Sequence, residues 1–267
     1  MKPEFNIFGI KIYSYHLMII ISLFLMIIIN VVRAKKYGYK IVFGVVTAIL
    51  VNVFAILGAF LMYKLEMFPY KEKGNGLSFY GTVFFLPIFM FIIGKIFKKN
   101  IKDYSDYWSL TVPMELAIVR IGCYLAGCCY GITTKYGVHF PFDQEGVNRV
   151  PVQLIEMGLD FIVFGLLIIN EKNKKNKGLG YPIFMMLYGI IRFIIECFRT
   201  NPKIILGLSN AHIFSIISFI VGIIFIIKIL FNHNQKESEW HFTFLLMFGS
   251  IKWFYKRTLS TNWKENH

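Results

Sequence analysis

The chain is poor in charged residues, and those it has are mostly of one sign. Only 16% of its 267 residues are charged, whereas 56% are hydrophobic, which excludes a disordered chain and disfavours an ordinary soluble domain. Acidic residues number 15 against 29 basic ones, so the formal net charge is +14. A nucleic-acid-binding protein would carry such an excess on one folded surface, but here it lies in the connections between apolar blocks, so we disfavour that class.

Seven apolar blocks are each about as long as the ~20 residues that a membrane-spanning helix needs. They lie near Tyr13–Val32, Ile41–Tyr63, Phe79–Phe97, Trp108–Tyr130, Val152–Asn170, Leu179–Phe198 and Ala211–Phe231. We therefore predict an all-α integral membrane protein whose residues 1–231 form one seven-helix domain. The first block is followed by basic residues in place of a small-residue cleavage site, so we expect it to remain as an anchor.

The basic residues predict the orientation. Four occur in or directly beside each of the first, third and fifth connections, and five occur after Phe231, whereas the other connections carry two or three. The odd-numbered sets are Arg33, Lys35, Lys36 and Lys40; Lys95, Lys98, Lys99 and Lys102; and Lys172, Lys174, Lys175 and Lys177. By the positive-inside rule the N-terminus lies outside and the C-terminus in the cytoplasm. The basic and aromatic tail, residues 232–267, is then either an interfacial cytoplasmic helix or a poorly ordered segment.

Residues 119–131 read VRIGCYLAGCCYG and place Arg120 at the end of an apolar run. A guanidinium at membrane depth costs ~2.5–3.5 kcal/mol on insertion scales, so Arg120 needs a partner or a function. Gly127 and Gly131 lie close by and have two interpretations. They form a Gly-x-x-x-Gly pair, which indicates close helix packing, or they let the backbone approach a lipid headgroup.

The sixth block carries Arg192, Glu196 and Arg199 at spacings of four and three, with Tyr188 a turn earlier. These side chains would share one helical face. One interpretation is a self-neutralising ion-pair ladder. We favour the other, in which two arginines and one carboxylate leave a surplus positive charge that joins Arg120 around a phosphodiester. We therefore expect both buried arginines to face one internal cavity with Glu196.

The fifth block carries a second polar stripe, Gln153, Glu156 and Asp160. Like charges at this spacing repel, so we expect them to pair with cations of other helices, Arg120 or Arg192. Structural pairing and direct catalysis remain equally open for this stripe. We expect Glu115, which lies off the face of Arg120, to be structural, and His212 to lie at the membrane interface.

Four cysteines, at 123, 128, 129 and 197, all lie in or beside the apolar blocks. The spacing Cys-x4-Cys-Cys is not typical of structural zinc, and adjacent Cys128 and Cys129 do not pair easily. We favour small apolar packing over a metal site or a disulfide, and expect Cys128 to pack beneath Gly127 and Gly131.

The segment Arg120–Gly131 resembles the signature of prolipoprotein diacylglyceryl transferases, bacterial membrane enzymes that lipidate lipoprotein precursors. The resemblance runs from about Gly9 to Leu230. Other similar fragments, in the same order, are Tyr15, Gly76–Gly81, Asp106 with Pro113, Pro151–Glu156 and Leu187–Arg199. The chain departs from the family pattern at four positions, where Cys123 replaces asparagine, Cys128 replaces glutamate, and Tyr80 and Val150 replace histidines.

The resemblance implies transfer of a diacylglyceryl group from phosphatidylglycerol to the lipobox cysteine of a prolipoprotein signal peptide, in the bacterial cytoplasmic membrane. It implies catalytic roles for Tyr15, Tyr80, Arg120, Arg192 and Glu196, and substrate-binding roles for Gly127, Gly131, Gln153, Glu156, Tyr188 and Arg199. Membrane lipids are the further expected partners, and no metal or soluble cofactor is indicated. Two alternatives stay open: a paralogue that lipidates another acceptor, and a non-catalytic lipid-binding membrane protein. We disfavour a transporter because no broken-helix repeat is evident.

Overall fold

Long apolar helices make up most of the chain in the computed structural model, which describes residues 3–7, 10–67, 78–173, 177–201, 203 and 207–231. The helices are α1 (Ser14–Lys36), α2 (Ile41–Met67), α3 (Phe79–Ile96), α4 (Ile101–Ser109), α5 (Thr111–Ala126), α6 (Val152–Lys172), α7 (Gly180–Cys197) and α8 (Asn210–Phe231). Within the described residues, six stretches are long and apolar enough to cross a membrane. The predicted helical membrane protein is confirmed at this level, while the tail from 232 lies outside the described residues.

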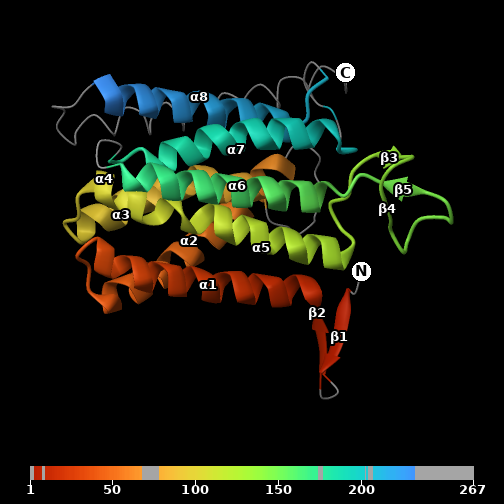
Figure 1. The fold of residues 1–267 in the computed structure, drawn as a ribbon, viewed down its shortest axis with the longest axis horizontal. Helices are drawn as coiled ribbons and strands as arrows, with labels where there is room; N and C mark the ends of the chain where they lie inside the picture. The colour runs from red at the N-terminus through yellow and green to blue at the C-terminus, as the bar shows by residue number, and fades with distance from the viewer. Residues whose placement is uncertain are drawn as a thin grey trace.

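The helices lie side by side in one bundle (Figure 1). α1 packs along α5, α2 along α3, α5 along α6 and α7 along α8. Missing side chains allow close contacts between these helices: a Cβ on Gly81 of α3 would overlap the Gly58 carbonyl oxygen of α2, and one on Gly189 of α7 would lie 2.7 Å from the Ser215 carbonyl oxygen of α8. Large apolar side chains such as Phe24, Val42 and Ile169 are exposed on the outer faces of the helices, as lipid contact requires.

The fourth apolar block differs from the prediction of one helix over Trp108–Tyr130. The chain forms the short helix α4, turns at Leu110 and begins α5 at Thr111, with Pro113 in the first turn, where proline costs no hydrogen bond. α5 then stops at Ala126 because Gly127 adopts a left-handed conformation, φ 70°. Residues 127–131 therefore form a loop, so the helix-packing interpretation of Gly127 and Gly131 is wrong.

Short strands add to the predicted all-α architecture. β1 (Glu4–Ile7) and β2 (Ile10–Tyr13) form an antiparallel hairpin that leads directly into α1. The connection between α5 and α6 folds into a three-stranded antiparallel sheet in the order β3-β5-β4, formed by β3 (Thr133–Thr134), β4 (Val138–His139) and β5 (Asn148–Arg149). Both sheets lie at the same end of the bundle (Figure 1), which we call the sheet end.

The opposite end carries the turns between α1 and α2, α3 and α4, and α6 and α7 (Figure 1), and we call it the basic end. Described members of the odd-numbered Lys and Arg sets, such as Lys36, Lys99 and Lys177, lie in or beside these turns. Buried Arg33 of α1 closes this end. Its Nε donates to the Tyr107 carbonyl oxygen at 3.0 Å, and its Nη2 donates to the Asp106 carbonyl oxygen at 2.7 Å.

A carboxylate completes this basic-end network. Glu171 of α6 accepts from Arg33 Nη1 at 2.9 Å and from Arg33 Nη2 at 2.7 Å. The Tyr37 hydroxyl donates to the same carboxylate, and Lys36 Nζ lies 2.9 Å from it. Burial raises the pKa of Tyr37, so this hydroxyl keeps its proton. All three guanidinium nitrogens of Arg33 therefore have oxygen partners.

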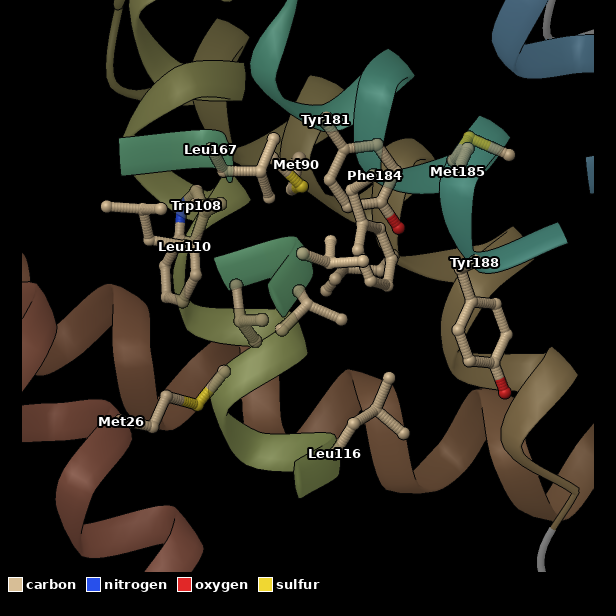
Figure 2. Close-up of a cluster of buried hydrophobic side chains, with 14 of the residues drawn as sticks. Met26, Met90, Trp108, Leu110, Leu116, Leu167, Tyr181, Phe184, Met185 and Tyr188 are labelled. Carbon is tan, nitrogen blue, oxygen red and sulfur yellow. The ribbon is translucent and has the colours of Figure 1, made fainter. Parts of the chain in front are cut away.

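Aromatic and aliphatic side chains fill the centre of the bundle (Figure 2). Tyr181, Phe184 and Tyr188 follow one face of α7, and the rings of Phe184 and Tyr188 stack 5.7 Å apart. Trp108 of α4 and Leu167 of α6 lie beside them in the same cluster. This core separates the basic end from the sheet end and holds α5, α6 and α7 in a fixed register.

Candidate functional site at the sheet end

Arg120 lies in the last two turns of α5, near the sheet end, and only 9% of its surface is exposed. Its Nη2 donates to Glu156 Oε1 at 2.8 Å. The other oxygen of Glu156 accepts from Arg192 Nη1 at 3.4 Å. One carboxylate of α6 thus holds two arginines from α5 and α7, which confirms the predicted pairing of Glu156 with cations on other helices.

Glu196 extends this arrangement by one turn of α7. Its Oε2 accepts from Arg192 Nη2 at 2.9 Å. We call Arg120, Glu156, Arg192 and Glu196 the sheet-end cluster. The cluster brings together three of the residues that the resemblance marks as catalytic. Its two arginines face two carboxylates, so it is neutral as a unit, whereas the sequence suggested a surplus of positive charge.

The second oxygen of Glu196 has partners that the sequence analysis missed. It accepts from Ser209 Oγ at 2.7 Å and from Asn201 Nδ2 at 2.6 Å. Ser209 Oγ also lies 3.0 Å from Nδ1 of His212, which is 7% exposed. His212, in the first turn of α8, is therefore buried near Glu196, and its place at the membrane interface stays a prediction. Five and thirteen residues separate Asn201 and Ser209 from Glu196, so no helical spacing could reveal these contacts.

Two predicted members of the sixth-block face behave differently. α7 ends at Cys197 with Phe198 as its C-cap, so Arg199 follows the helix and does not continue its face. The predicted shared face for all three charges is wrong, because the helix ends two residues before Arg199. Tyr188 does lie on α7, where it is buried in the core against Phe184.

A cavity of about 270 Å³ lies beside the cluster, between α1, α2 and α5. Its polar lining includes Tyr15, Asn52, Glu115, Arg120 and the thiols of Cys123, Cys128 and Cys129, and the rest of the wall is largely apolar. Arg192 and Glu196 do not line it, so of the two arginines expected to share a cavity, Arg120 alone reaches this one. Glu115, expected off the face of Arg120, lines the same cavity.

Arg120 keeps unused donor capacity at this wall. Its Nε has no hydrogen-bond partner among the described residues. Its Nη1 meets a sulfur atom, Cys123 Sγ, at 3.9 Å. A buried N–H without an acceptor is costly, and here it belongs to a cation bordering a cavity that can admit an anionic ligand.

The loop after α5 holds the other wall of the cavity. Gln153 of α6 donates from Nε2 to the Cys128 carbonyl oxygen at 2.6 Å. Gly131 N donates to the Val150 carbonyl oxygen at 3.0 Å, and a Cβ on Gly131 would lie 2.8 Å from that oxygen and from the Phe198 carbonyl oxygen. Gly131 thus joins the α5–α6 connection to the end of α7, and Gly127 turns the chain toward this junction.

Three thiols gather at the same loop. The sulfur atoms of Cys123, Cys128 and Cys129 all lie within 4.8 Å of one another. The chain folds back because Cys129 adopts a positive φ of 60°, a conformation that sequence spacing does not reveal. The Cys-x4-Cys-Cys spacing favoured small apolar packing over a metal site, and it does not reveal that the fold brings the three sulfur atoms together.

Two further predicted residues stand apart. Asp160 is 1% exposed, and neither of its carboxylate oxygens has a hydrogen-bond partner among the described residues, so no arginine bonds it as expected. Tyr80 belongs to the first turn of α3, but its side chain lies outside the described residues.

The sheet that follows this loop is fixed by a bidentate pair. Arg149 donates from Nε to Asp143 Oδ2 at 2.6 Å and from Nη2 to Asp143 Oδ1 at 2.7 Å. These hydrogen bonds hold the pKa of Asp143 below its ordinary value. The guanidinium also lies 4.6 Å from the centroid of the Tyr130 ring. The predicted outer loop is therefore a small ordered cap over the sheet end.

Comparison with known proteins supports the family resemblance over nearly the whole chain. The sequence profile described as prolipoprotein diacylglyceryl transferase matches residues 3–228. A phosphatidylglycerol–prolipoprotein diacylglyceryl transferase of Clostridium tetani is 32% identical over 241 residues, covering 84% of this chain and 96% of the relative. The enzyme designated 2 of Clostridium perfringens is 30% identical over 248 residues, covering 87% and 96%. The Finegoldia magna enzyme is 32% identical over 241 residues, covering 85% and 95%.

Proposed function

Because the chain belongs to the prolipoprotein diacylglyceryl transferase family, we propose that it transfers the diacylglyceryl group of phosphatidylglycerol to the thiol of a lipoprotein precursor. The acceptor would be the lipobox cysteine of the signal peptide. A thioether forms and glycerol phosphate leaves. The reaction needs cations at the departing phosphate, an ionised thiol and a cavity sheltered from water.

The observation that carries this proposal is Arg120, which lines the cavity and whose buried Nε–H has no hydrogen-bond partner among the described residues. A phosphate oxygen would supply the acceptor that this donor lacks among the described residues. The negative charge on the phosphate grows as the glyceryl carbon–oxygen bond breaks, so a fixed guanidinium stabilises the transition state more than the bound lipid. The apolar part of the cavity wall would contact the acyl chains of the lipid where they join the glyceryl group.

The rest of the sheet-end cluster would act by fixing the two arginines. Glu156 accepts hydrogen bonds from both guanidinium groups, and Glu196 accepts a further hydrogen bond from Arg192. Arg120 therefore meets a phosphate without having to order its side chain first, which lowers the cost of binding. Tyr15 lines the same cavity as Arg120, and in this proposal it would contact the glyceryl group or the acceptor.

We also propose seven spans with the N-terminus outside and the C-terminus in the cytoplasm of a bacterial cell. α3 supplies the seventh span with 18 residues, which is just long enough. The basic end would face the cytoplasm and the sheet end the outer surface, in keeping with the positive-inside rule. The cavity then opens on the side where exported precursors arrive.

Cysteine labelling tests this topology. Tyr136 is 91% exposed at the sheet end, and Lys36 carries a half-exposed side chain at the basic end. In intact cells an impermeant thiol reagent should modify a cysteine at position 136 and spare one at position 36. Unmodified parent protein is the control for the four native cysteines, and the reverse pattern would contradict the orientation.

The activity is tested with the full chain in phosphatidylglycerol nanodiscs and a lipobox peptide. We expect glycerol phosphate release and a peptide mass increase by one diacylglyceryl group. Glycerol phosphate without a modified peptide would favour a paralogue with another acceptor, and neither product would favour a non-catalytic lipid-binding protein. An Arg33→Lys variant, changed far from the cavity, is the matched control for Arg120→Lys.

A further inference from the structure

We propose that the three-thiol cluster of Cys123, Cys128 and Cys129 binds a Zn²⁺ ion whose open fourth position takes the thiol of the acceptor cysteine. The role in acceptor activation rests on the proposed function, because it explains how that acceptor is made nucleophilic. It departs from the sequence-based expectation of no metal. That expectation considered only spacing, whereas the proposal follows from where the fold places the sulfur atoms.

The distances suit a metal. The three sulfur atoms all lie within 4.8 Å of one another. Zinc–sulfur bonds of ~2.3 Å in a tetrahedron put the sulfur atoms roughly 3.8 Å apart. Each pair therefore has to close by at most about 1 Å, which side-chain rotation can supply without moving the backbone.

The backbone around the thiols is already folded for this arrangement. Cys123 lies in the last turn of α5, and the left-handed residues Gly127 and Cys129 fold the chain back over it. The Cys128 amide donates to the Cys123 carbonyl oxygen at 3.0 Å, and Gln153 holds the Cys128 carbonyl oxygen from α6. The loop is thus fixed by contacts other than a metal, and the thiols remain available as ligands.

The donor set suits a thiolate-binding ion such as Zn²⁺ and leaves one position open. Three sulfur ligands favour zinc over the oxygen-seeking Mg²⁺ and Ca²⁺. Among the described residues, no His, Asp, Glu or fourth Cys joins the group. Structural zinc sites are closed by four protein ligands, whereas sites with three keep a place for a reactant. All three cysteines line the cavity beside Arg120, so the open position would face it.

The chemistry balances without an external oxidant or reductant. On binding zinc the acceptor thiol releases its proton to water at the outer face and becomes a thiolate. Its sulfur attacks the glyceryl carbon that bears the phosphate, so a carbon–sulfur bond forms as the carbon–oxygen bond breaks. The electron pair leaves on glycerol phosphate as a dianion, and zinc keeps its oxidation state. Arg120, 3.9 Å from Cys123 Sγ, lies where it can hold that anion.

Metal binding is tested on the full chain in nanodiscs, reduced with a phosphine and supplied with Zn²⁺ or Co²⁺ alone. We expect about one Zn²⁺ per chain and, for Co²⁺, an intense thiolate-to-cobalt absorption band. Cys129→Ser should weaken metal binding by at least the ~10–100-fold that loss of an outer-shell partner costs. The control is Cys197→Ser, which changes an exposed cysteine outside the cluster and should bind metal like the parent.

Three results would overturn the metal site. They are absence of bound Zn²⁺ and Co²⁺, a cobalt spectrum without the thiolate band, and a Cys129→Ser protein that binds metal like Cys197→Ser. A mass 2 Da below that of the reduced chain in freshly isolated protein, retained when Zn²⁺ is added, would also overturn it in favour of a disulfide.

Activity separates this inference from the proposed function. Zinc-stripped protein should lose peptide modification, regain it with Zn²⁺ and still bind phosphatidylglycerol through Arg120. Full activity of stripped protein would contradict the zinc role and leave the proposed function standing. Zinc-loaded protein that gives neither glycerol phosphate nor thioether would contradict the proposed function and the acceptor role, and the cobalt spectrum would still decide the metal site.

Discussion

Two buried arginines, one at each end of the bundle, differ in how completely their donors are used. Arg33 at the basic end and Arg120 at the sheet end are 7% and 9% exposed, so burial does not separate them. All three nitrogens of Arg33 have oxygen partners, whereas Nε of Arg120 has no partner among the described residues. Arg120 borders a cavity, and Arg33 is not among the residues that line it. An arginine whose hydrogen-bond donors are all used stabilises the fold. An arginine that keeps an unused donor beside a cavity is available to a ligand.

The largest expected effect is on activity at the sheet end. Arg120→Lys removes the planar guanidinium and its Nε donor, so we expect diacylglyceryl transfer to fall by ~10²–10³-fold, as for loss of an oxyanion donor. Arg33→Lys should keep activity within about threefold of the parent per folded molecule. Turnover in phosphatidylglycerol nanodiscs measures both. Equal losses in the two variants would remove the distinction between the two arginines.

At the basic end the effect should appear in stability. Arg33→Gln leaves Glu171 without its guanidinium and removes the Arg33 donors to the Tyr107 and Asp106 carbonyl oxygens, of which the second keeps Ser109 Oγ, so we expect a loss of roughly 3–5 kcal/mol in unfolding free energy. Arg120→Gln should cost less, because Arg192 still pairs with Glu156. Denaturant unfolding in detergent measures this. A larger loss for Arg120→Gln would make the sheet-end arginine the structural one.

A smaller effect should follow from loosening Glu196. Ser209→Ala removes the 2.7 Å hydrogen bond to Glu196 Oε1, so Arg192 is held less firmly and we expect a roughly tenfold fall in turnover. Ser218→Ala is the control. Ser218 is a residue of α8, and its hydroxyl donates to the Met185 carbonyl oxygen at 2.9 Å. It should cost similar stability without changing turnover. Identical turnover in the two variants would deny Ser209 a positioning role.

The two carboxyl groups of α6 offer a comparison within one helix. Glu156→Gln removes the charge that grips both arginines, so turnover should fall by on the order of tenfold or more. Asp160→Asn changes a side chain that has no hydrogen-bond partner among the described residues and should leave turnover within about threefold. A severe loss in Asp160→Asn would show that this carboxyl takes part in the site.

The smallest effect concerns the outer sheet and depends on pH. Arg149 holds the folded-state pKa of Asp143 below the unfolded value of ~3.9. The stabilisation by this pair is therefore present above pH ~3.9 and is lost as pH falls through the lower folded-state pKa. Amide exchange of residues 138–149 should be slower in the parent than in Asp143→Asn at neutral pH, and the difference should disappear as the pH falls well below ~3.9. A difference that persists there would contradict the pairing.

The sequence predicted the helices well because apolar length is a local property. Each of the seven blocks corresponds to a helix or to parts of two, and described basic residues of the odd-numbered connections, such as Lys36, Lys99 and Lys177, lie at one end of the bundle. The turn at Leu110 was missed because it lies inside a continuous apolar stretch. The end of α5 depends on the left-handed conformation of Gly127. The Gly-x-x-x-Gly pattern suggested that the helix continues through this residue.

The candidate site was predictable only where its residues share a helix or carry an unpaired charge. Arg192 with Glu196 follows from helical spacing, and Glu156 was assigned to the buried arginines because their charges need partners. Ser209 and the three-thiol cluster depend on loops that return to the bundle, and such contacts leave no spacing in the sequence. Arg199 was misplaced because α7 ends before it.

A crystal structure of the chain grown in a lipid phase containing phosphatidylglycerol would test the central claim most directly. The account predicts a phosphate with an oxygen about 3 Å from Arg120 Nε, its glyceryl carbons in the cavity, and the hydrogen bonds of Arg33 unchanged. A phosphate bound elsewhere, with Arg120 Nε still lacking an oxygen partner, would contradict the assignment of Arg120 to the departing phosphate.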